Sequence, residues 1–308
     1  MTIILETPAL QPRTPALRQL LSTAVALFKL RIVALLLFAG AGGAFLAAGG
    51  WPGFTPLLLM TLTGGLAAMG ASALNQYFEQ GTDATMKRTR QRPLVAGLVE
   101  RPAWIPAVAL ALILGPSLAV YPFNPALAVW SLAGAVIYAG VYTVWLKPRT
   151  VLNIVLGGLA GTCAVLCGGA AVGPSAAAQG WAHPGVVTLG LLVFLWTPTH
   201  FWSLAIMYRE DYARVNIPML PVRASVRASA WWVLLHALGT GLAALLLGAL
   251  PSLGLLYVIP AALLTLDLLA RCGRLIAEPT SARARSLFMA SNTYLAGVLL
   301  MICVAALI

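Results

Sequence analysis

Nine long apolar segments constrain the fold of this chain more than any other feature of its sequence. A helix needs about 20 apolar residues to cross the hydrocarbon core of a bilayer, and each segment is close to that length. Only 9% of the 308 residues are charged, whereas a soluble domain carries roughly 25%. The sequence therefore predicts an all-α, polytopic membrane protein. Its nine transmembrane helices are expected at about 26–48, 55–78, 103–121, 125–145, 151–172, 185–207, 230–249, 251–271 and 288–307.

Positively charged residues occur in every second connection between these segments. All 19 lysines and arginines lie in or beside the N-terminal segment, or in the connections after segments two, four, six and eight. The remaining connections contain none: 49–54, 122–124, 173–184 and 249–252. The positive-inside rule then predicts a cytoplasmic N-terminus and an external C-terminus in a bacterial cytoplasmic (inner) membrane. This topology accounts for the net charge of +11, so the lipid bilayer and not nucleic acid is the expected partner.

A row of oxygen-bearing side chains stands where the second apolar segment meets the cytoplasm. Asn75, Glu79 and Asp83 follow one another at four-residue intervals, which places them on one face of a helix. Such hard oxygen ligands suit Mg²⁺, which binds one or two carboxylates together with substrate phosphates. The next residues supply the cations that a diphosphate needs: Lys87, Arg88, Arg90 and Arg92. The alternative is that the cations only determine topology and that the carboxylates pair with Lys87.

A second acidic cluster follows the sixth apolar segment, on the same predicted side of the membrane. Glu210 and Asp211 stand at a helix end, and Arg214 comes directly after them. This cluster alone is a weak signal. Together the two clusters predict a site that holds a metal–diphosphate and stabilises its departure at the membrane face.

Three stretches of the chain carry a resemblance to a known family. Residues 75–97 have the pattern N-x-x-x-E-x-x-x-D-x-x-M-x-R-T-x-x-R-P-L-x-x-G, which resembles the first motif of the UbiA-type intramembrane prenyltransferases. YTVWLKPRTVLNIVLGGLAG at 142–161 and FLWTPTHFWSLAIMYREDYARVNIPMLP at 194–221, with the spacing between them, resemble the haem O synthase branch, the protohaem IX farnesyltransferases. The resemblance covers about residues 25–305, nearly the whole chain.

The resemblance implies a fold and a reaction. It implies a cytoplasmic segment over 1–24 and one prenyltransferase domain over 25–308, with nine helices around a central cavity under a cytoplasmic cap. Members of this branch transfer a farnesyl group from farnesyl diphosphate to a vinyl group of haem B, with addition of water, and release haem O and diphosphate. Haem B would thus be a substrate and not a prosthetic group. The implied partners are haem A synthase or terminal-oxidase assembly factors.

The resemblance also assigns roles to individual residues. Four would hold Mg²⁺ on the diphosphate: Asn75, Glu79, Asp83 and Asp211. Three cations would bind the diphosphate oxygens: Arg88, Arg92 and Lys147. Lys87, a variable position of the motif, joins them as part of the cationic run described above. The catalytic set implied by these two groups is Glu79, Asp83, Arg88, Arg92 and Asp211. Many members of the superfamily carry another acid four residues after Asp211, where this chain has Val215.

Histidines are the candidates for contact with haem. His200 lies within the sixth segment, eleven residues before Asp211 and on about the same helix face. An ionisable side chain within a membrane segment is a functional candidate, although His200 could instead be a hydrogen-bonded structural residue near Pro198. His236 is a second candidate, and His183, in an external connection, is a weaker one.

Three other functions remain as alternatives. A prenyltransferase for an aromatic acceptor, either a quinone precursor or a chlorin, would share the same acidic clusters. An anion transporter would require internal repeats and charges near the membrane midplane, and neither is evident. A haem carrier without enzymatic activity would need His200 but not the row of Asn75, Glu79 and Asp83.

Overall fold

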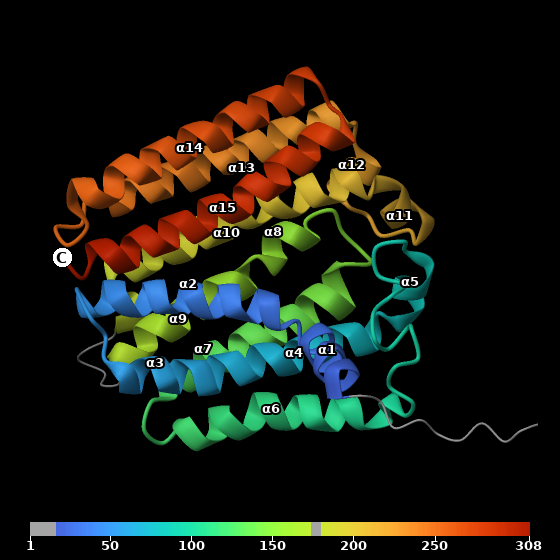
Figure 1. Ribbon diagram of the computed structural model, residues 1–308, viewed down its shortest axis with the longest axis horizontal. Helices are drawn as coiled ribbons and strands as arrows, with labels where there is room; N and C mark the ends of the chain where they lie inside the picture. The colour runs from blue at the N-terminus through green and yellow to red at the C-terminus, as the bar shows by residue number, and fades with distance from the viewer. Residues whose placement is uncertain (1–16, 174–179) are drawn as a thin grey trace, which may run out of the picture.

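Nine apolar helices dominate the computed structural model, which describes residues 17–173 and 180–308 (Figure 1). Within these residues the chain is helical and has no β-strand. The nine candidate spans are α2 (Leu30–Ala48), α3–η1–α4–α5 (Phe54–Met60, Thr61–Gly65, Leu66–Phe78, Gln80–Thr85), η2–α6 (Pro102–Trp104, Ile105–Val120), α7–η3 (Pro125–Ala135, Val136–Leu146), α8–α9 (Asn153–Gly157, Leu159–Val172), α10 (Pro184–Met207), α13 (Val226–Leu247), α14 (Gly254–Ala277) and α15 (Ser281–Ala305). The short elements are α1 (Leu17–Leu27), η5 (Gly180–Ala182), α11 (Arg209–Arg214) and α12 (Leu220–Arg223). The predicted all-α fold with nine spans is confirmed for the described part of the chain.

Some helix boundaries differ from the prediction. The first span begins at Leu30 and not at residue 26, because Lys29 adopts a left-handed backbone conformation (φ 49°, ψ 46°) that separates α1 from α2. The last two spans are longer than their apolar segments, and only residues 278–280 separate α14 from α15. A polar contact between the two helices accompanies this extension, since Arg271 Nη1 of α14 donates to the hydroxyl of Ser286, in the added part of α15, at 2.6 Å. α14 ends just before Pro279, as expected because a proline disfavours the helical conformation of the residue that precedes it.

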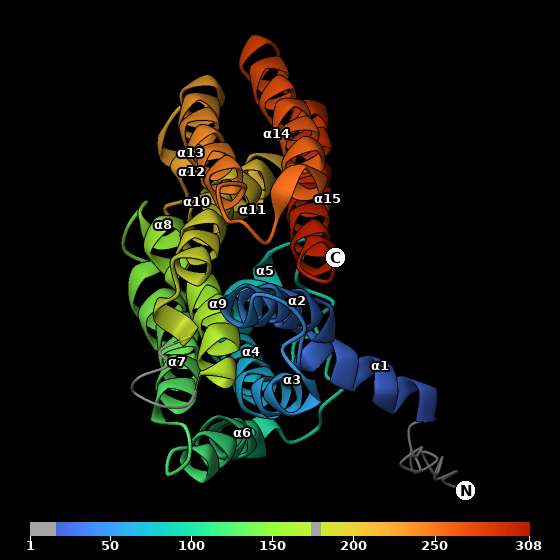
Figure 2. The ribbon, with the colours of Figure 1, turned by 90° about the vertical axis from the view of Figure 1, so that its left-hand side faces the viewer.

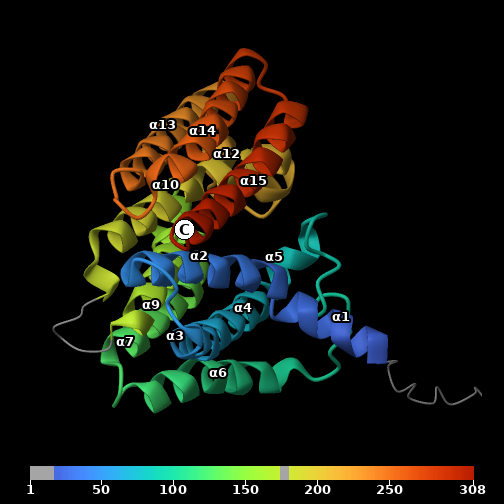
Figure 3. The same cartoon turned by 60° about the vertical axis from the view of Figure 1, so that its left-hand side comes forward.

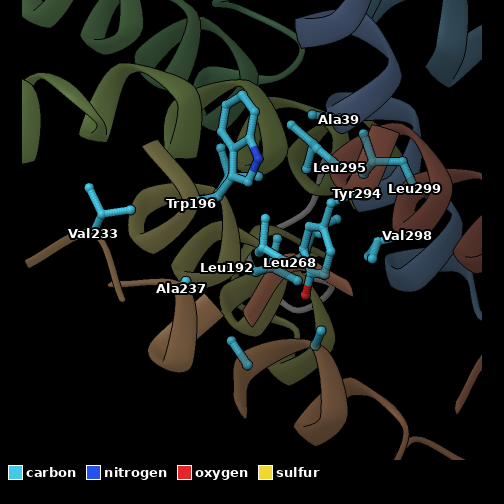
Figure 4. Packing of buried hydrophobic residues seen from close by; sticks show 14 of the residues in the cluster. Ala39, Leu192, Trp196, Val233, Ala237, Leu268, Tyr294, Leu295, Val298 and Leu299 are labelled. Atoms are coloured by element: carbon cyan, nitrogen blue, oxygen red, sulfur yellow. The ribbon is translucent and has the colours of Figure 1, made fainter. Parts of the chain in front are cut away.

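Two groups of helices pack on either side of α2 and α9 (Figures 2 and 3). On one side, α10, α13, α14 and α15 share the largest hydrophobic core with residues of α2 and α9. Figure 4 shows part of this core, with Leu192 and Trp196 of α10 near Tyr294 and Leu295 of α15. On the other side, α3, α4, α6 and α7 form two smaller clusters.

Glycines allow α2 and α9 to approach each other closely. A Cβ atom on Gly168 would lie 1.7 Å from the carbonyl oxygen of Gly40, and one on Gly43 would lie 2.3 Å from that of Val165. No larger side chain can occupy these positions without moving a backbone. Close contact through small residues is the usual way in which membrane helices associate. It makes α2 and α9 a tightly joined pair at the centre of the bundle.

A cavity of about 400 Å³ lies between the helix groups. Its walls come from α2, α3, η1, α4, α7, η3, α8, α9 and α10, with Asn292 and Leu295 contributed by α15. Most of the lining side chains are apolar, and the polar ones include Tyr138, Tyr142 and His200. The cavity that the family resemblance implied is therefore present.

Polar connections close one end of the bundle (Figure 1). We define the cap as residues 79–101 together with residues 208–223, which include α5, α11 and α12. Both segments follow helices that line or flank the cavity, so the cap can present charged groups to its mouth.

Candidate active site

The first part of the site is the junction between α4 and α5. Glu79 interrupts the helix (φ −93°, ψ 4°), but the backbone hydrogen bonds from Glu79 to Asn75 and from Asp83 to Glu79 keep helical spacing at 3.1 and 2.8 Å. The predicted alignment of the three side chains on one face therefore survives the interruption. Asn75, Glu79 and Asp83 are all buried, with exposed fractions of 2, 7 and 2%. Carboxylates this deeply buried need partners.

The partners are two cations from outside this helix. Arg92 Nη1 lies 2.5 Å from Asp83 Oδ2 and 3.4 Å from Glu79 Oε2. Lys147, at the end of η3, forms an ion pair with Glu79 Oε1. Lys87, the partner expected from helical spacing, is exposed and takes no part in the ion pairs of the described residues. The carboxylates thus bind together segments that are far apart in the sequence.

Arg92 reaches these carboxylates because the chain turns back after α5. The hydroxyl of Thr89 donates to the backbone oxygen of Asp83 at 3.1 Å, and the backbone N–H of Arg92 donates to Thr89 at 2.9 Å. Burial opposes the charge of Arg92, but the neighbouring Asp83 and Glu79 outweigh it and raise the pKa of the guanidinium above its ordinary value. The arginine is therefore fixed in its charged form.

The second part of the site is Asp211 on α11, which is 4% exposed. Its Oδ2 accepts a hydrogen bond from the backbone N–H of Arg88 at 3.3 Å, and its Oδ1 pairs with Arg214 at 3.3 Å. The side chain of Arg88 lies over the ring of Tyr208, with 5.8 Å between the guanidinium carbon and the ring centroid. The structure thus connects the two predicted clusters through the turn that carries Arg88. Glu210 does not join them, because its side chain is 88% exposed.

Lys29 also belongs to the site. From the sequence, it was expected only to contribute to the positive charge that sets the membrane topology. Its Nζ donates to Asn75 Oδ1 at 2.5 Å and to the hydroxyl of Tyr138 at 2.9 Å. Burial, together with the positive charge of Arg92, lowers the pKa of Lys29 to about 7. Its position within the apolar run LFKLRI was the available signal, since a cation at the edge of a membrane span needs a partner.

Gln76 holds in place the turn between α1 and α2, which carries Lys29 and is called here the corner. Its Nε2 donates to the carbonyl oxygens of Ala26 at 2.7 Å and Leu27 at 2.8 Å, at the end of α1. These contacts support the left-handed conformation of Lys29, which is unusual for a residue other than glycine. The corner directs Lys29 toward Asn75.

The oxygen donors suit a hard cation, although the protein does not complete a metal site alone. Asn75, Glu79, Asp83 and Asp211 offer only carboxylate and amide oxygens, the atoms that Mg²⁺ prefers. Within residues 17–173 and 180–308, no three acidic, cysteine or histidine side chains form a group that could hold a metal ion. Asp83 Oδ1 has no hydrogen-bond partner among these residues, whereas its Oδ2 is bound by Arg92. The donor set fits a cation that shares its ligands with a bound phosphate group.

The charged site meets the apolar cavity at two tyrosines. Tyr138 and Tyr142 line the cavity, and their rings stack with centroids 5.8 Å apart. Tyr138 accepts from Lys29, and Lys147 Nζ lies 5.9 Å from the ring centroid of Tyr142. The arrangement can therefore bind a polyanion at the cap while an attached apolar chain enters the cavity.

The two histidines considered for haem contact lie in different surroundings. His200 of α10 lines the cavity and is 9% exposed. His236 of α13 does not line it, and its Nδ1 lies 2.9 Å from the carbonyl oxygen of Trp232 one turn earlier. His183 caps the start of α10 by accepting from the backbone N–H of Gly185. Among the three histidines, only His200 faces the cavity.

Sequence comparison relates the chain to one protein family. The model of the UbiA prenyltransferase family matches residues 35–294. A relative from Saccharolobus islandicus (strain L.S.2.15), named protoheme IX farnesyltransferase, is 39% identical over 293 residues, or 95% of this chain and all of the relative. A protein of the same name from Thermus thermophilus is 41% identical over 273 residues, or 88% of this chain. The chain spans only 44% of the length of that Thermus relative.

Solved structures share the fold at low sequence identity. A digeranylgeranylglyceryl phosphate synthase aligns with a TM-score of 0.74 and 18% identity, over 94% of this chain and 99% of the other. A UbiA homolog from Aeropyrum pernix K1 gives 0.65 and 18%, over 89% and 96%. A UbiA homolog from Archaeoglobus fulgidus, bound to GPP and Mg²⁺, gives 0.60 and 15%, over 91% and 99%.

Proposed function

This chain belongs to the UbiA prenyltransferase family, and from that premise we propose that it makes haem O. In the proposed reaction, the farnesyl group of farnesyl diphosphate is transferred to a vinyl group of haem B, with addition of water and release of diphosphate. The observation that carries this choice is the 39% identity, over the full length of the relative, to a protein named protoheme IX farnesyltransferase. A physical reason supports the same choice, because buried cations and carboxylates, such as Arg92 with Asp83, lie near an apolar cavity that is lined by a histidine.

Three carboxylates of the cap, together with the amide of Asn75, would bind the metal ion. Asn75, Glu79, Asp83 and Asp211 are buried oxygen donors at the cap end of the cavity. Bound together with the diphosphate, Mg²⁺ would neutralise part of the negative charge that develops on the leaving group. In support, the related structure from Archaeoglobus fulgidus contains Mg²⁺ together with a prenyl diphosphate.

The cations would bind the diphosphate oxygens. Arg92 and Lys147 already lie beside the carboxylates, while Lys87 and Arg88 extend from the same turn with exposed side chains. Arginine can contact two phosphate oxygens at once, and lysine adds a point charge. Held in this way, the diphosphate leaves more readily because its growing charge is stabilised before the allylic C–O bond breaks.

The apolar cavity would hold the farnesyl chain and the acceptor. An allylic cation reacts with water, so walls that exclude water protect it until the vinyl group attacks. The vinyl group is a weak nucleophile, and ionisation of the diphosphate should therefore precede bond formation. The protein supplies no covalent nucleophile in this scheme, and a farnesyl adduct trapped on the chain during turnover would contradict it. His200, the histidine of the cavity wall, is placed to contact the haem.

The proposed orientation puts the cap in the cytoplasm of a bacterial cell. All the positive charges of the sequence belong to the N-terminal segment and the connections on the predicted inner side. In this orientation both substrates reach the site from the cytoplasmic face, and the C-terminus lies outside. A terminal-oxidase assembly factor or a haem A synthase would then receive the product within the membrane.

The deciding experiment measures product formation in membranes that contain the protein. With haem B, farnesyl diphosphate and Mg²⁺, the product should be a haem heavier by one farnesyl group and one hydroxyl group, since the other hydrogen of the added water leaves as a proton. Asp83→Asn should lower the rate by about 10²-fold or more, because it removes a charge from the site that stabilises the leaving group. Asp267→Asn is the matched control, since Asp267 is half-exposed and pairs only with Arg271. No haem product, or equal rates for the two variants, would contradict the proposal, and prenylation of an aromatic acid instead of haem would replace it.

A further inference from the structure

One residue of α15, Ser291, contacts two cavity-lining residues of α10. The carbonyl oxygen of Ser291 accepts the indole N–H of Trp196 at 2.8 Å, and its hydroxyl oxygen lies 2.9 Å from Nδ1 of His200. Trp196 and His200 are one helical turn apart, and both line the cavity. Ser291 itself is completely buried. Ser291 therefore orients the side chains of Trp196 and His200 from the side that faces away from the cavity, where no substrate can reach it.

The hydrogen bonds of Ser291 determine where the imidazole proton lies. A second contact joins the Ser291 hydroxyl to the carbonyl oxygen of Phe288 at 2.7 Å. A carbonyl oxygen can only accept, so the single hydroxyl proton of Ser291 must lie in that contact. The proton between Ser291 and His200 must then come from the imidazole. His200 therefore carries its proton on Nδ1.

Burial makes this imidazole neutral. His200 is 9% exposed and forms no ion pair with the described residues. A charged ring without a partner is unfavourable in such surroundings. A neutral imidazole with a proton on Nδ1 has a lone pair on Nε2. No described residue hydrogen-bonds to that Nε2.

The ring plane is fixed as well as the tautomer. The imidazole stacks on Trp196 and on Phe288, each with centroids 4.5 Å apart and with interplanar angles of 15° and 27°. These two rings form no aromatic pair with each other in the described chain, so they cover opposite faces of the imidazole. Phe201 packs against it edge to face at 5.2 Å. Only an edge of the ring remains available, and the Nδ1 edge is occupied by Ser291.

We propose that Ser291 is a positioning residue that holds His200 in the Nδ1-protonated tautomer, so that Nε2 can bind the iron of the haem substrate. Metal-binding histidines commonly donate their other ring N–H to a fixed acceptor, which sets both tautomer and orientation. Iron binding at Nε2 would fix the porphyrin in the cavity and so determine where its vinyl groups lie. The identity of the ligand rests on the proposed function, whereas the tautomer does not.

The tautomer can be tested without any substrate. The chain has three histidines, so the protein labelled with ¹⁵N-histidine gives few signals in solid-state NMR of bilayer samples. His200, assigned by its loss in His200→Gln, should show a protonated Nδ1 and an unprotonated Nε2. Ser291→Ala should redistribute the proton between the two nitrogens, and Ser291→Thr, which keeps a hydroxyl, should restore the original signals. A wild-type His200 protonated on Nε2 would overturn the inference, and this result requires no variant to fold.

Haem binding provides the second test. Ferric haem B added to the protein in nanodiscs should give the absorption spectrum of a histidine-ligated iron, and His200→Ala should abolish that spectrum. Ser291→Ala should weaken haem binding by about 10-fold or more, the usual effect of losing such an orienting partner. Ser229→Ala is the matched control, because Ser229 is a fully buried serine that donates to the Ser225 carbonyl and forms no hydrogen bond with a histidine of the described chain.

The outcomes separate this inference from the proposed function. If the protein farnesylates haem but Ser291→Ala changes neither the His200 tautomer nor haem affinity, Ser291 is not a positioning residue. If His200 shows the expected tautomer but the protein neither binds nor converts haem, the proposed function fails, and with it the iron-binding role of Nε2. A haem spectrum that survives His200→Ala would overturn the iron contact alone.

Discussion

Arg92 is the residue on which the buried carboxylates of the cap depend. It contacts both Asp83 and Glu79, whose side chains are only 3% and 8% exposed. Its own side chain is 19% exposed, so water does little to screen these pairs. The same guanidinium is a proposed contact for the diphosphate. Arg92 would therefore contribute to stability in the free protein and to leaving-group binding during the reaction.

Replacing Arg92 should separate these two contributions. Arg92→Ala leaves the Asp83 carboxylate buried without its main partner, and loss of one partner of a buried pair costs about 3–5 kcal/mol. We expect a clear fall in the melting temperature in detergent, together with loss of activity. The double variant Arg92→Ala with Asp83→Asn should recover stability but not activity, because it removes both charges.

An exposed ion pair provides the control for Arg92. Arg283 pairs with Glu278 at 2.9 Å, with side chains 42% and 62% exposed. Exposed pairs contribute at most about 1 kcal/mol, so Arg283→Ala should leave the melting temperature almost unchanged. Equal shifts for Arg92→Ala and Arg283→Ala would show that the cap pair is not structurally important.

At the scale of elements, the corner between α1 and α2 positions Lys29 for the site. Gln76→Leu would remove both donors to the carbonyls of Ala26 and Leu27 and so release this corner. We expect the KM for farnesyl diphosphate to rise several-fold, because Lys29 would no longer be held beside Asn75. Gln80→Leu is the control, since Gln80 donates only to the Tyr77 carbonyl three residues earlier. An unchanged KM in Gln76→Leu would show that the corner does not serve the site.

The contact between α2 and α9 is the second element that a single substitution can test. Gly168→Ala would place a methyl group against the Gly40 backbone, and no side-chain rotation can relieve that contact. Overpacking of this kind costs about 1–3 kcal/mol or more, so a lower melting temperature is expected. Gly115→Ala on α6 is the control, because a Cβ there meets no atom within 4 Å. Its melting temperature should stay equal or rise, because alanine favours a helix over glycine by roughly 0.5–1 kcal/mol. Equal losses in both variants would argue against the close helix contact.

At the scale of the whole molecule, the sequence predicts the architecture and the residue types of the candidate site, but not the contacts between them. The nine spans follow from apolar length alone, and the row of Asn75, Glu79 and Asp83 follows from helical spacing. The helix ends at 272–277 and 281–287 were not predictable from hydropathy, because arginines such as Arg274, Arg283 and Arg285 interrupt the apolar pattern although the helices continue through them. The pairing of Glu79 with Lys147 and the position of Lys29 depend on packing between distant segments, which no local pattern encodes.

The orientation of the whole bundle in the membrane is the remaining prediction. The described residues contain nine candidate spans, and an odd number predicts that the termini lie on opposite sides of the membrane. The distribution of lysine and arginine predicts that the cap lies inside the cell. Phe123→Cys, at an 80% exposed position in a connection without positive charge, should react with a membrane-impermeant maleimide in intact cells. Arg90→Cys, at an exposed position in the cap, should react only after the membrane is opened. The native cysteines are buried or half-buried, so their background labelling should be low. The reverse labelling pattern would place the cap outside the cell and would exclude the proposed entry of the substrates from the cytoplasm.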